Sequence, residues 1–268
     1  MIIPSRFQDR VIRHFIAASV RDAHPLILAI QGPPGSGKSF QLWNALSDAR
    51  IKPVHNAAVE LSGGYEGDSA AALREAVLLA VNDPAKTAIV INDLDLSPAG
   101  QSDRSVYTVN SQLLVGALMD LCDQGDSVRR ADGYRVPIYV TGNNLELLPR
   151  PVTRPSRMDI YTWTPSSEEV TEIVSAMFHD AGFQVDLSSL RTYASDTSWS
   201  IARYAAALSE LVADRLLAQQ QKLGRIDLSA ARSLLQTNGA KEKVSLQELS
   251  RVLGNMQGPL NHLEEVAK

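Results

Sequence analysis

The sequence of 268 residues contains a single cysteine, Cys122, and lacks any long run of apolar side chains. One cysteine cannot form a disulfide within the chain, which favours a reducing, cytoplasmic environment, and we interpret it as a small buried apolar residue. No window approaches the roughly 20 apolar residues that cross a bilayer. Residues 1–7 lack the basic and apolar regions of an export signal. We therefore expect neither membrane insertion nor secretion.

An excess of positive charge is also missing. The 26 lysines and arginines are outnumbered by 30 aspartates and glutamates, giving a net charge of −4. Surfaces that follow a nucleic-acid backbone are usually basic, so a nucleic-acid partner is not expected. One basic cluster is present, Arg129, Arg130 and Arg135, and it fits a local basic patch as well as a solvated loop. The length allows one large domain or two smaller ones.

The most informative feature that is present is a phosphate loop. Residues 32–39 read Gly-Pro-Pro-Gly-Ser-Gly-Lys-Ser, between an apolar run and a helical one. The glycines let successive N–H groups point at one anion, and a helix N-terminus adds partial positive charge. Lys38 would reach the outer phosphates, and the Ser39 hydroxyl would bind Mg²⁺. The expected nucleotide contacts are Gly32, Pro33, Pro34, Gly35, Ser36, Gly37, Lys38, Ser39 and Phe40.

Apolar runs typical of strands alternate with amphipathic runs typical of helices in the first 165 residues. The strands are expected at 26–30, 54–56, 88–91, 136–141 and 160–163. The helices are expected around 7–16 and at 40–46, 69–81 and 109–121. This alternation predicts an α/β fold with a parallel sheet covered by helices on both faces.

After Pro165 the pattern becomes helical. Ser166 to Glu169 is a helix-start signature with a serine cap and acidic residues. No further strand is expected, and one apolar stripe comprises Ile201, Tyr204, Ala205, Leu208 and Leu211. We predict a nucleotide-binding α/β domain over 1–165 and a helical domain over 166–268, with a C-terminal helical extension from about residue 236.

A buried apolar run ends in Asn92 and Asp93, a second element of a nucleotide site. Acidic groups there lie beside the metal and the γ-phosphate, so we expect Asp93 to activate water and Asn92 to lie on the metal side. The alternative is that these groups only cap the strand end. Asn143 ends a later strand and is expected to hold the attacking water or the γ-phosphate. No Asn-Lys-x-Asp guanine motif occurs, which favours ATP over GTP.

Two arginines, Arg154 and Arg157, follow these strands. Arginines past the sheet can touch the γ-phosphate of a neighbouring subunit. The alternative is a pair of surface arginines in salt bridges.

Together these residues resemble the AAA+ ATPases and, within them, the Rubisco activases. The activase-like stretches are 4–7, 37–41, 91–95, 106–113, 135–144 and 200–201. The resemblance covers about residues 4–215. It implies an AAA+ P-loop fold with a helical lid, reduced to the ATPase core as in the shorter bacterial forms.

The resemblance also implies roles for single residues. Lys38 and Ser39 would be Walker A residues, and Asn92 and Asp93 Walker B residues, so that Ser39, Asn92 and Asp93 surround Mg²⁺. Asn143 would be sensor 1, Arg154 and Arg157 arginine fingers, and Arg203 a sensor 2 residue. The segment around Phe7 would border the adenine.

A glycine-rich loop contains Tyr65, Glu66 and Gly67, which resemble the aromatic-x-glycine motif of threading motors. Its aromatic ring would grip polypeptide through apolar contact, with Tyr107 in a second pore loop. The alternative is that Tyr65 packs on its own loop. The resemblance implies a homo-oligomeric, hexameric ring acting on a protein client, Rubisco, in the cytoplasm, or in a plastid stroma or carboxysome of a photosynthetic host. A different protein client and, less favoured, a nucleic-acid loader remain alternatives.

Overall fold

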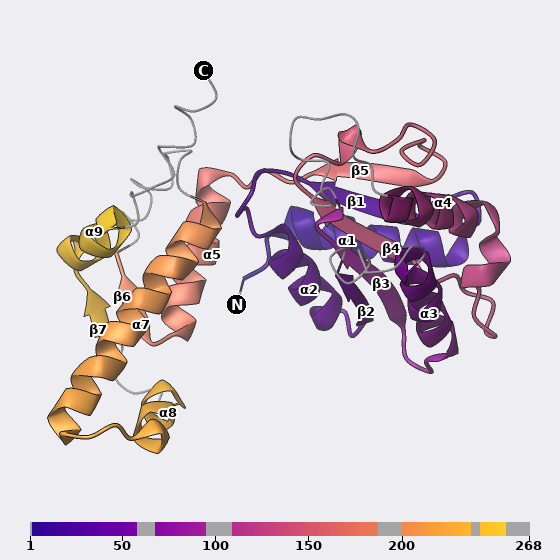
Figure 1. Cartoon of the computed structure of the whole chain (residues 1–268). Coiled ribbons are helices and arrows are strands. Elements are labelled where there is room, and N and C mark those ends of the chain that lie inside the picture. Colours follow the sequence, from indigo (N-terminus) through magenta and orange to yellow (C-terminus); the bar gives the residue numbers. More distant parts are fainter. Residues whose placement is uncertain (1, 58–67, 95–108, 187–199, 237–241, 256–268) are drawn as a thin grey trace. The chain divides into compact units, whose positions relative to one another are not determined.

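The computed structural model describes residues 2–57, 68–94, 109–186, 200–236 and 242–255. The chain forms two compact units, and each is described by itself (Figure 1). The larger unit comprises Ser5–Thr164, and the smaller comprises Met1–Pro4 and Pro165–Lys268. The change of unit falls beside Pro165, where the sequence becomes helical.

The larger unit is built on a five-stranded sheet with the strand order β2-β3-β4-β1-β5. The strands are β1 (Ile27–Gln31), β2 (Lys52–Ala57), β3 (Thr87–Asn92), β4 (Ile138–Gly142) and β5 (Met158–Thr162). All neighbouring strands pair in parallel. The carboxyl ends of all five strands therefore lie along one edge of the sheet, and β5 is an edge strand.

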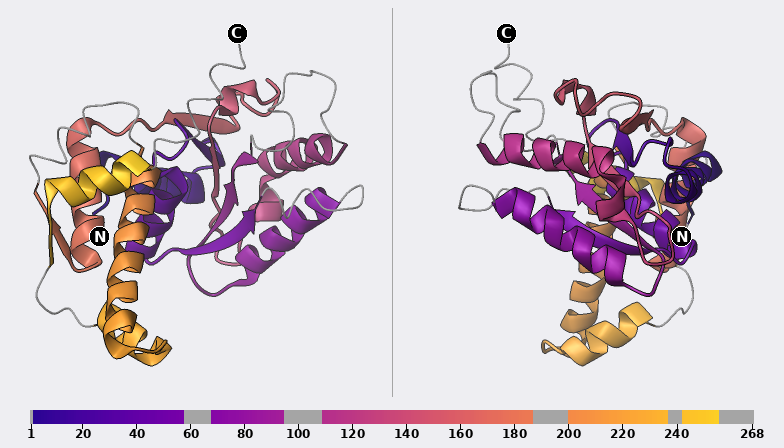
Figure 2. Two further views of the ribbon diagram at one scale, coloured as in Figure 1. Left: turned by 60° about the vertical axis from the view of Figure 1, so that its left-hand side comes forward. Right: turned by 90° about the vertical axis from the view of Figure 1, so that its right-hand side faces the viewer.

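Helices cover both faces of this sheet (Figure 2). They are α1 (Ser5–Val20), α2 (Lys38–Asp48), α3 (Asp68–Asn82) and α4 (Val109–Asp123), with short 3₁₀ turns η3 (Gly125–Val128) and η4 (Leu145–Leu147). Helix α1 packs against α2, and α3 packs against α4. Successive strand residues face opposite sides, so Val140 joins the core under α3 and α4 while the Tyr139 hydroxyl donates to the Val11 carbonyl of α1. The predicted α/β architecture is confirmed.

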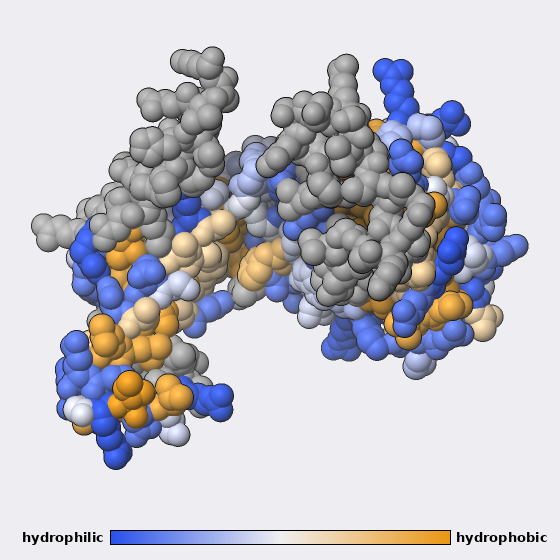
Figure 3. Space-filling view, viewed as in Figure 1, coloured by the Kyte–Doolittle hydropathy of each residue, from blue (hydrophilic) through white to orange (hydrophobic). Residues whose placement is uncertain are grey.

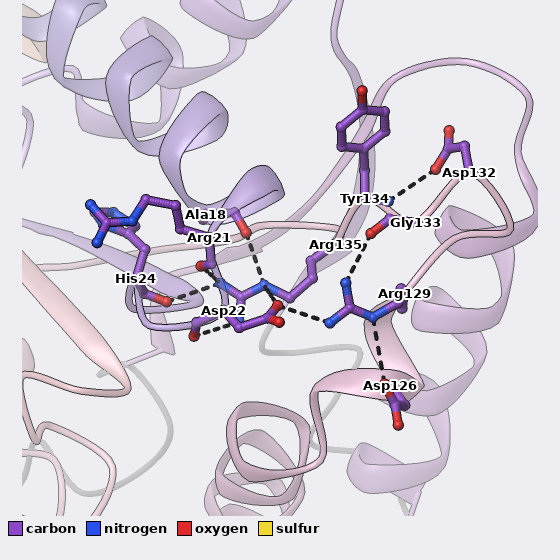
Figure 4. Close-up of polar contacts among 10 residues, drawn as sticks. All are labelled: Ala18, Arg21, Asp22, His24, Asp126, Arg129, Asp132, Gly133, Tyr134 and Arg135. Atoms are coloured by element: carbon purple, nitrogen blue, oxygen red, sulfur yellow. Dashed lines mark hydrogen bonds and ion pairs between the residues drawn. The ribbon is translucent and has the colours of Figure 1, made fainter.

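Arg135 anchors the C-terminal end of α1 (Figure 4). Its side chain is buried, and its guanidinium donates to the carbonyl oxygens of Ala18 (2.9 Å), Arg21 (2.7 Å), Asp22 (3.3 Å) and His24 (2.9 Å). The last carbonyls of a helix have no partner within the helix, so a cation there satisfies both hydrogen bonding and the helix dipole. Arg135 thus fixes the turn that leads from α1 into β1.

The neighbouring arginines are also engaged within the chain. Arg129 bonds Asp22 at 2.8 Å, and Arg130 bonds Asp132 at 3.1 Å and the Ala85 carbonyl at 2.8 Å. Arg135 is buried, so it belongs neither to a basic surface patch nor to a solvated loop. All three arginines are structural anchors, because each guanidinium bonds to acceptors of the surrounding segments.

The smaller unit contains four described helices: α5 (Ser167–Asp180), α7 (Ile201–Leu223), α8 (Leu228–Gln236) and α9 (Leu246–Asn255). Ser166 forms the expected capping box at the start of α5. The prediction of no further strand is wrong, because β6 (Phe183–Val185) and β7 (Glu242–Val244) pair in parallel. Three residues per strand are too few to produce a recognisable alternation.

The core of this unit is the apolar face of α7 packed on α5 and α9. Ile201, Tyr204 and Leu211 are buried as predicted. The predicted Ala205 is exposed, and Ala207 is buried in its place. Three residues advance about 300° round a helix and one advances about 100°, so Ala207 lies nearer to the Tyr204 face.

Apolar side chains are exposed over the end of α7 and over α8 (Figure 3). They are Leu217, Leu223, Ile226 and Leu228. Across the described part of the chain, no helix combines the length and the apolarity that a membrane span requires.

Candidate nucleotide site

The phosphate loop lies at the carboxyl edge of the sheet, between β1 and α2. Gly32 has φ +157°, and a Cβ there would lie 2.0 Å from the Trp163 carbonyl oxygen. The indole nitrogen of the fully buried Trp163 donates to the Ser36 carbonyl at 3.0 Å. The loop is therefore held against the end of β5 at two points, and position 32 accepts only glycine.

Lys38 is buried within this loop, 6% exposed. Its ammonium donates to the carbonyl oxygens of Gly32 (2.8 Å) and Pro33 (2.9 Å) and to Asn143 Oδ1 (3.1 Å). A lysine ammonium has three protons, so these contacts use its donors in full. The predicted Walker lysine and the predicted sensor asparagine are thus in direct contact.

Thr141 of β4 joins the remaining polar groups. Its hydroxyl donates to Asn92 Oδ1 at 3.1 Å and accepts from the backbone N–H of Asp93 at 3.2 Å. The Ser39 hydroxyl lies 3.1 Å from the same oxygen. A hydroxyl has one proton and two acceptor positions, so donation from Ser39 completes its bonding. Thr141 therefore connects the end of β3 to the start of α2.

Asp93 adopts a left-handed backbone conformation, with φ 52°. This conformation is uncommon outside glycine, although aspartate tolerates it better than most residues. It turns the chain directly after β3, and the bond from the Asp93 amide to Thr141 supports it. Such strained positions cluster at functional sites.

Gln31 ends β1 and links three strand ends. Its amide nitrogen donates to Glu146 Oε1 (3.0 Å) and to the Thr162 hydroxyl (3.2 Å), and its oxygen accepts from the Leu145 amide (3.0 Å). Its own backbone carbonyl accepts from the Trp163 amide at 2.7 Å. Gln31 therefore fixes the segment after β4 and the end of β5 relative to the phosphate loop.

The loop suits a triphosphate with its metal. Gly37 occupies the N-cap of α2 with a left-handed backbone and no side chain, so the first amides of the helix are open to an anion. The buried Ser36 hydroxyl has no hydrogen-bond partner among the described residues. Ser39 and Asn92 supply oxygen atoms of the kind that Mg²⁺ binds, on either side of Thr141.

The two arginines differ in their surroundings. Arg154 is exposed. The Arg157 side chain is 17% exposed, binds Asp123 at 2.9 and 2.5 Å and donates to the Pro151 carbonyl. The bond to Arg157 holds the pKa of the Asp123 carboxyl below its usual value. Arg157 is therefore used within its own subunit, whereas Arg154 projects from the surface.

The contacts described above do not include the other predicted residues. Phe40 is 42% exposed on the first turn of α2. Arg203 lies in the smaller unit, at the third position of α7. Tyr65, Glu66, Gly67 and Tyr107 lie outside the described residues. Burial raises the pKa of the Cys122 thiol to about 12, which suits an inert side chain.

Sequence reasoning missed Thr141, Trp163 and Gln31. Gln31 is the last residue of β1 and Thr141 is the last but one of β4, at the carboxyl edge of the sheet. A polar side chain at such a position in an apolar run was an available signal. Trp163 had no such signal, because an aromatic residue after a strand is ordinarily core.

These features define a P-loop ATPase of the α/β class. The model of the AAA family, the ATPase family associated with various cellular activities, matches residues 28–166, just over half of the chain. The chain therefore belongs to this family. The predicted family and enzyme class are confirmed.

Among curated proteins, the chain is similar to chloroplastic ribulose bisphosphate carboxylase/oxygenase activases. Identity is 31% over 188 residues with the Spinacia oleracea protein (66% of this chain, 40% of the relative). It is 35% over 188 residues with that of Malus domestica (66% and 43%) and 33% over 195 residues with that of Chlamydomonas reinhardtii (68% and 48%). The chain spans less than half the length of these relatives. The predicted likeness to Rubisco activases is confirmed.

Proposed function

We propose that this chain is an ATP-driven remodelling protein that acts on a protein client, Rubisco, as a homo-oligomeric ring with a central pore. The main support is the network of Lys38, Asn143, Ser39 and Thr141, which brings two predicted strand ends to the phosphate loop. The similarity to Rubisco activases supports the client.

In this proposal ATP binds along residues 32–39 with Mg²⁺ held near Ser39, Asn92 and Asp93. Lys38 would exchange its two loop carbonyls for phosphate oxygens, and a bound Mg²⁺ would supply charge neutralisation at the phosphates. Asp93 accepts a proton from the attacking water, and Asn143 orients that water or the γ-phosphate. The Asn92 side chain on the metal side carries no charge. Asp93 therefore supplies the carboxylate of this pair.

A ring is supported by the exposure of Arg154, which is free to reach a neighbouring subunit's nucleotide. The pore-loop roles of Tyr65, Glu66, Gly67 and Tyr107, the sensor 2 role of Arg203 and the contacts of Phe40 belong to this proposal. The hexameric state and a cytoplasmic, stromal or carboxysomal location also belong to this proposal. The engagement of Arg129, Arg130 and Arg135 within the chain weakens the nucleic-acid alternative.

The test is reactivation of inhibited Rubisco by the purified chain with ATP and Mg²⁺. We expect recovery of carboxylation that needs hydrolysable ATP and is lost in Lys38→Ala, because that variant cannot hold the outer phosphates. Normal ATP hydrolysis without reactivation of any Rubisco form would replace Rubisco by another client. Normal hydrolysis by Lys38→Ala would overturn the nucleotide site itself.

A further inference from the structure

Three potential metal ligands meet in the larger unit, away from the phosphate loop. One ring nitrogen each of His14 and His24 and one carboxylate oxygen of Asp159 lie within 4.8 Å of one another. His14 belongs to α1, His24 to the turn before β1, and Asp159 to β5. In the β1–β5 register Asp159 pairs with Leu28, three residues before Gln31. At ~3.3 Å per residue the cluster lies about 10 Å along the strand from the phosphate loop.

The hydrogen bonding of His14 leaves one of its two ring nitrogens with an unused lone pair. His14 is 2% exposed, and its Nε2 lies 3.3 Å from the Leu26 carbonyl oxygen. A carbonyl only accepts, so Nε2 carries the proton and Nδ1 has the lone pair. Nδ1 is buried without a partner among the described residues. A histidine that donates one ring N–H to a backbone carbonyl is the usual state of a metal ligand.

His24 offers a second unsatisfied nitrogen. Its Nε2 is buried and has no partner within the described ranges of the chain. Its backbone is fixed by Arg135, which donates to the His24 carbonyl at 2.9 Å (Figure 4). The two imidazole rings lie 5.4 Å apart between centroids. Buried ring nitrogens without a partner are costly, and a cation bound by both rings would remove that cost.

Asp159 completes the donor set. Its Oδ1 binds Arg10 at 2.6 Å, which leaves the other oxygen for a cation. A metal-bound carboxylate is commonly held by such an outer hydrogen bond. The positive charges of Arg10, Arg21 and Arg135 also act on the histidines and oppose a cation, so binding should be weaker than at a closed four-ligand site.

From this geometry we propose that His14, His24 and Asp159 form a binding site for a first-row transition-metal dication of the Zn²⁺ class, distinct from the nucleotide site. Two imidazoles and one carboxylate match the ligand preference of zinc and leave a position for water.

A bound metal would join α1, the turn held by Arg135 and the edge strand β5. The chain that follows Arg154 and Arg157 enters β5 directly. The site would therefore stabilise the larger unit against unfolding and fix the edge strand, without contact to the phosphate loop.

The experiment uses the full chain, stripped with a chelator and free of nucleotide. Zn²⁺ is titrated in competition with a chromophoric chelator, and Co²⁺ is added separately to record its visible absorption. We expect one equivalent per chain, tetrahedral-type Co²⁺ bands and a rise in Tm with Zn²⁺. His24→Ala and Asp159→Asn should each lower the affinity at least about 10-fold and abolish the Tm rise.

His179→Ala is the matched control, because His179 lies 3.7 Å from Asp180 on the surface of the smaller unit. It should bind like the unaltered chain. Both variants should fold, because His24→Ala shortens a side chain in a turn and Asp159→Asn keeps the shape of its side chain. Circular dichroism checks this. No binding at about 100 µM Zn²⁺, or equal binding by both variants, would overturn the proposal.

Discussion

At the scale of single residues, Thr141 connects more segments of the nucleotide site than its short side chain would suggest. Its hydroxyl satisfies groups from β3 and α2 at once. The Asp93 amide is one of these groups, and it belongs to a residue with φ 52°. Loss of this hydroxyl would therefore remove one hydrogen bond from the Asn92 amide and one from the turn at Asp93.

We predict that Thr141→Val lowers kcat for ATP hydrolysis by about 10- to 100-fold, because Asn92 and Asp93 lose their common partner. Valine keeps the volume, so stability should fall by only about 1–3 kcal/mol. Steady-state ATPase assays with varied Mg²⁺, together with nucleotide-binding titrations, measure the effect. The dissociation constant for ATP should change less than kcat.

Thr141→Ser is the matched control, since it keeps the hydroxyl and removes one methyl group. It should retain most of the turnover of the unaltered chain. An equal loss in the serine and valine variants would show that packing, and not the hydroxyl, matters at this position.

The candidate site was only partly predictable at this scale. Lys38, Ser39, Asn92 and Asn143 follow strands in contiguous patterns, so their neighbourhood could be inferred from parallel-strand geometry. Their individual roles stay predictions. Thr141 could not be assigned, because its partners come from separate segments. The cluster of His14 with Asp159 was equally hidden, since it depends on the β1–β5 register.

At the scale of elements, the start of α5 is defined by a capping box. The Ser166 hydroxyl accepts from the Glu169 amide at 3.3 Å, and the Glu169 carboxylate accepts from the Ser166 amide at 2.7 Å. These reciprocal bonds satisfy two amides that the helix itself cannot pair. Helix α5 supplies Val170, Ile173 and Phe178 to the core of the smaller unit.

We predict that Ser166→Ala destabilises the smaller unit by about 1 kcal/mol, because the Glu169 amide loses its acceptor. Urea unfolding followed by far-UV circular dichroism measures the change. Ser167→Ala is the control: this exposed serine is the first helical residue and has no capping role, so its midpoint should stay unchanged. Equal shifts for the two variants would contradict a capping effect.

Most elements were predictable because their lengths exceed a full period of their pattern. Helix α3 and strand β3 lie within one residue of their expected ends. Strands β6 and β7 escaped detection because they are three residues long and come from distant segments. Arg135 was misread because its sequence neighbours are charged and its acceptors, the carbonyls at the end of α1, have no sequence signature.

At the scale of the whole molecule, the proposed ring requires active sites that are shared between subunits. Arg157 already binds Asp123 and the Pro151 carbonyl of its own chain. Arg154 is exposed, and its charge acts on Asp123 less than that of Arg157 does. The two arginines of one motif can thus be separated by experiment, with Arg154 as the candidate for action on a neighbour.

We predict that Arg154→Ala and Lys38→Ala are each inactive alone and regain ATPase activity when mixed. In a mixed ring the Arg154→Ala subunit keeps its own phosphate loop and receives Arg154 from a Lys38→Ala neighbour. With random assembly about a quarter of the sites would be complete. Turnover of a 1:1 mixture, measured after subunit exchange, tests this.

Arg154→Ala should unfold like the unaltered chain, because its side chain is exposed. Arg157→Ala should be less stable, because Asp123 loses its partner. Activity that never recovers on mixing, with exchange verified by labelled subunits, would contradict the shared site. Full activity of Arg154→Ala alone would contradict it as well.

The close approach of Gly32 to the Trp163 carbonyl has a further consequence for communication between subunits. The phosphate loop rests on one end of β5, and the segment bearing Arg154 enters the other end. The closely packed interior of a protein transmits strain. In the proposed ring, β5 would therefore couple nucleotide binding at the phosphate loop to the position of Arg154, the residue that would reach the next subunit.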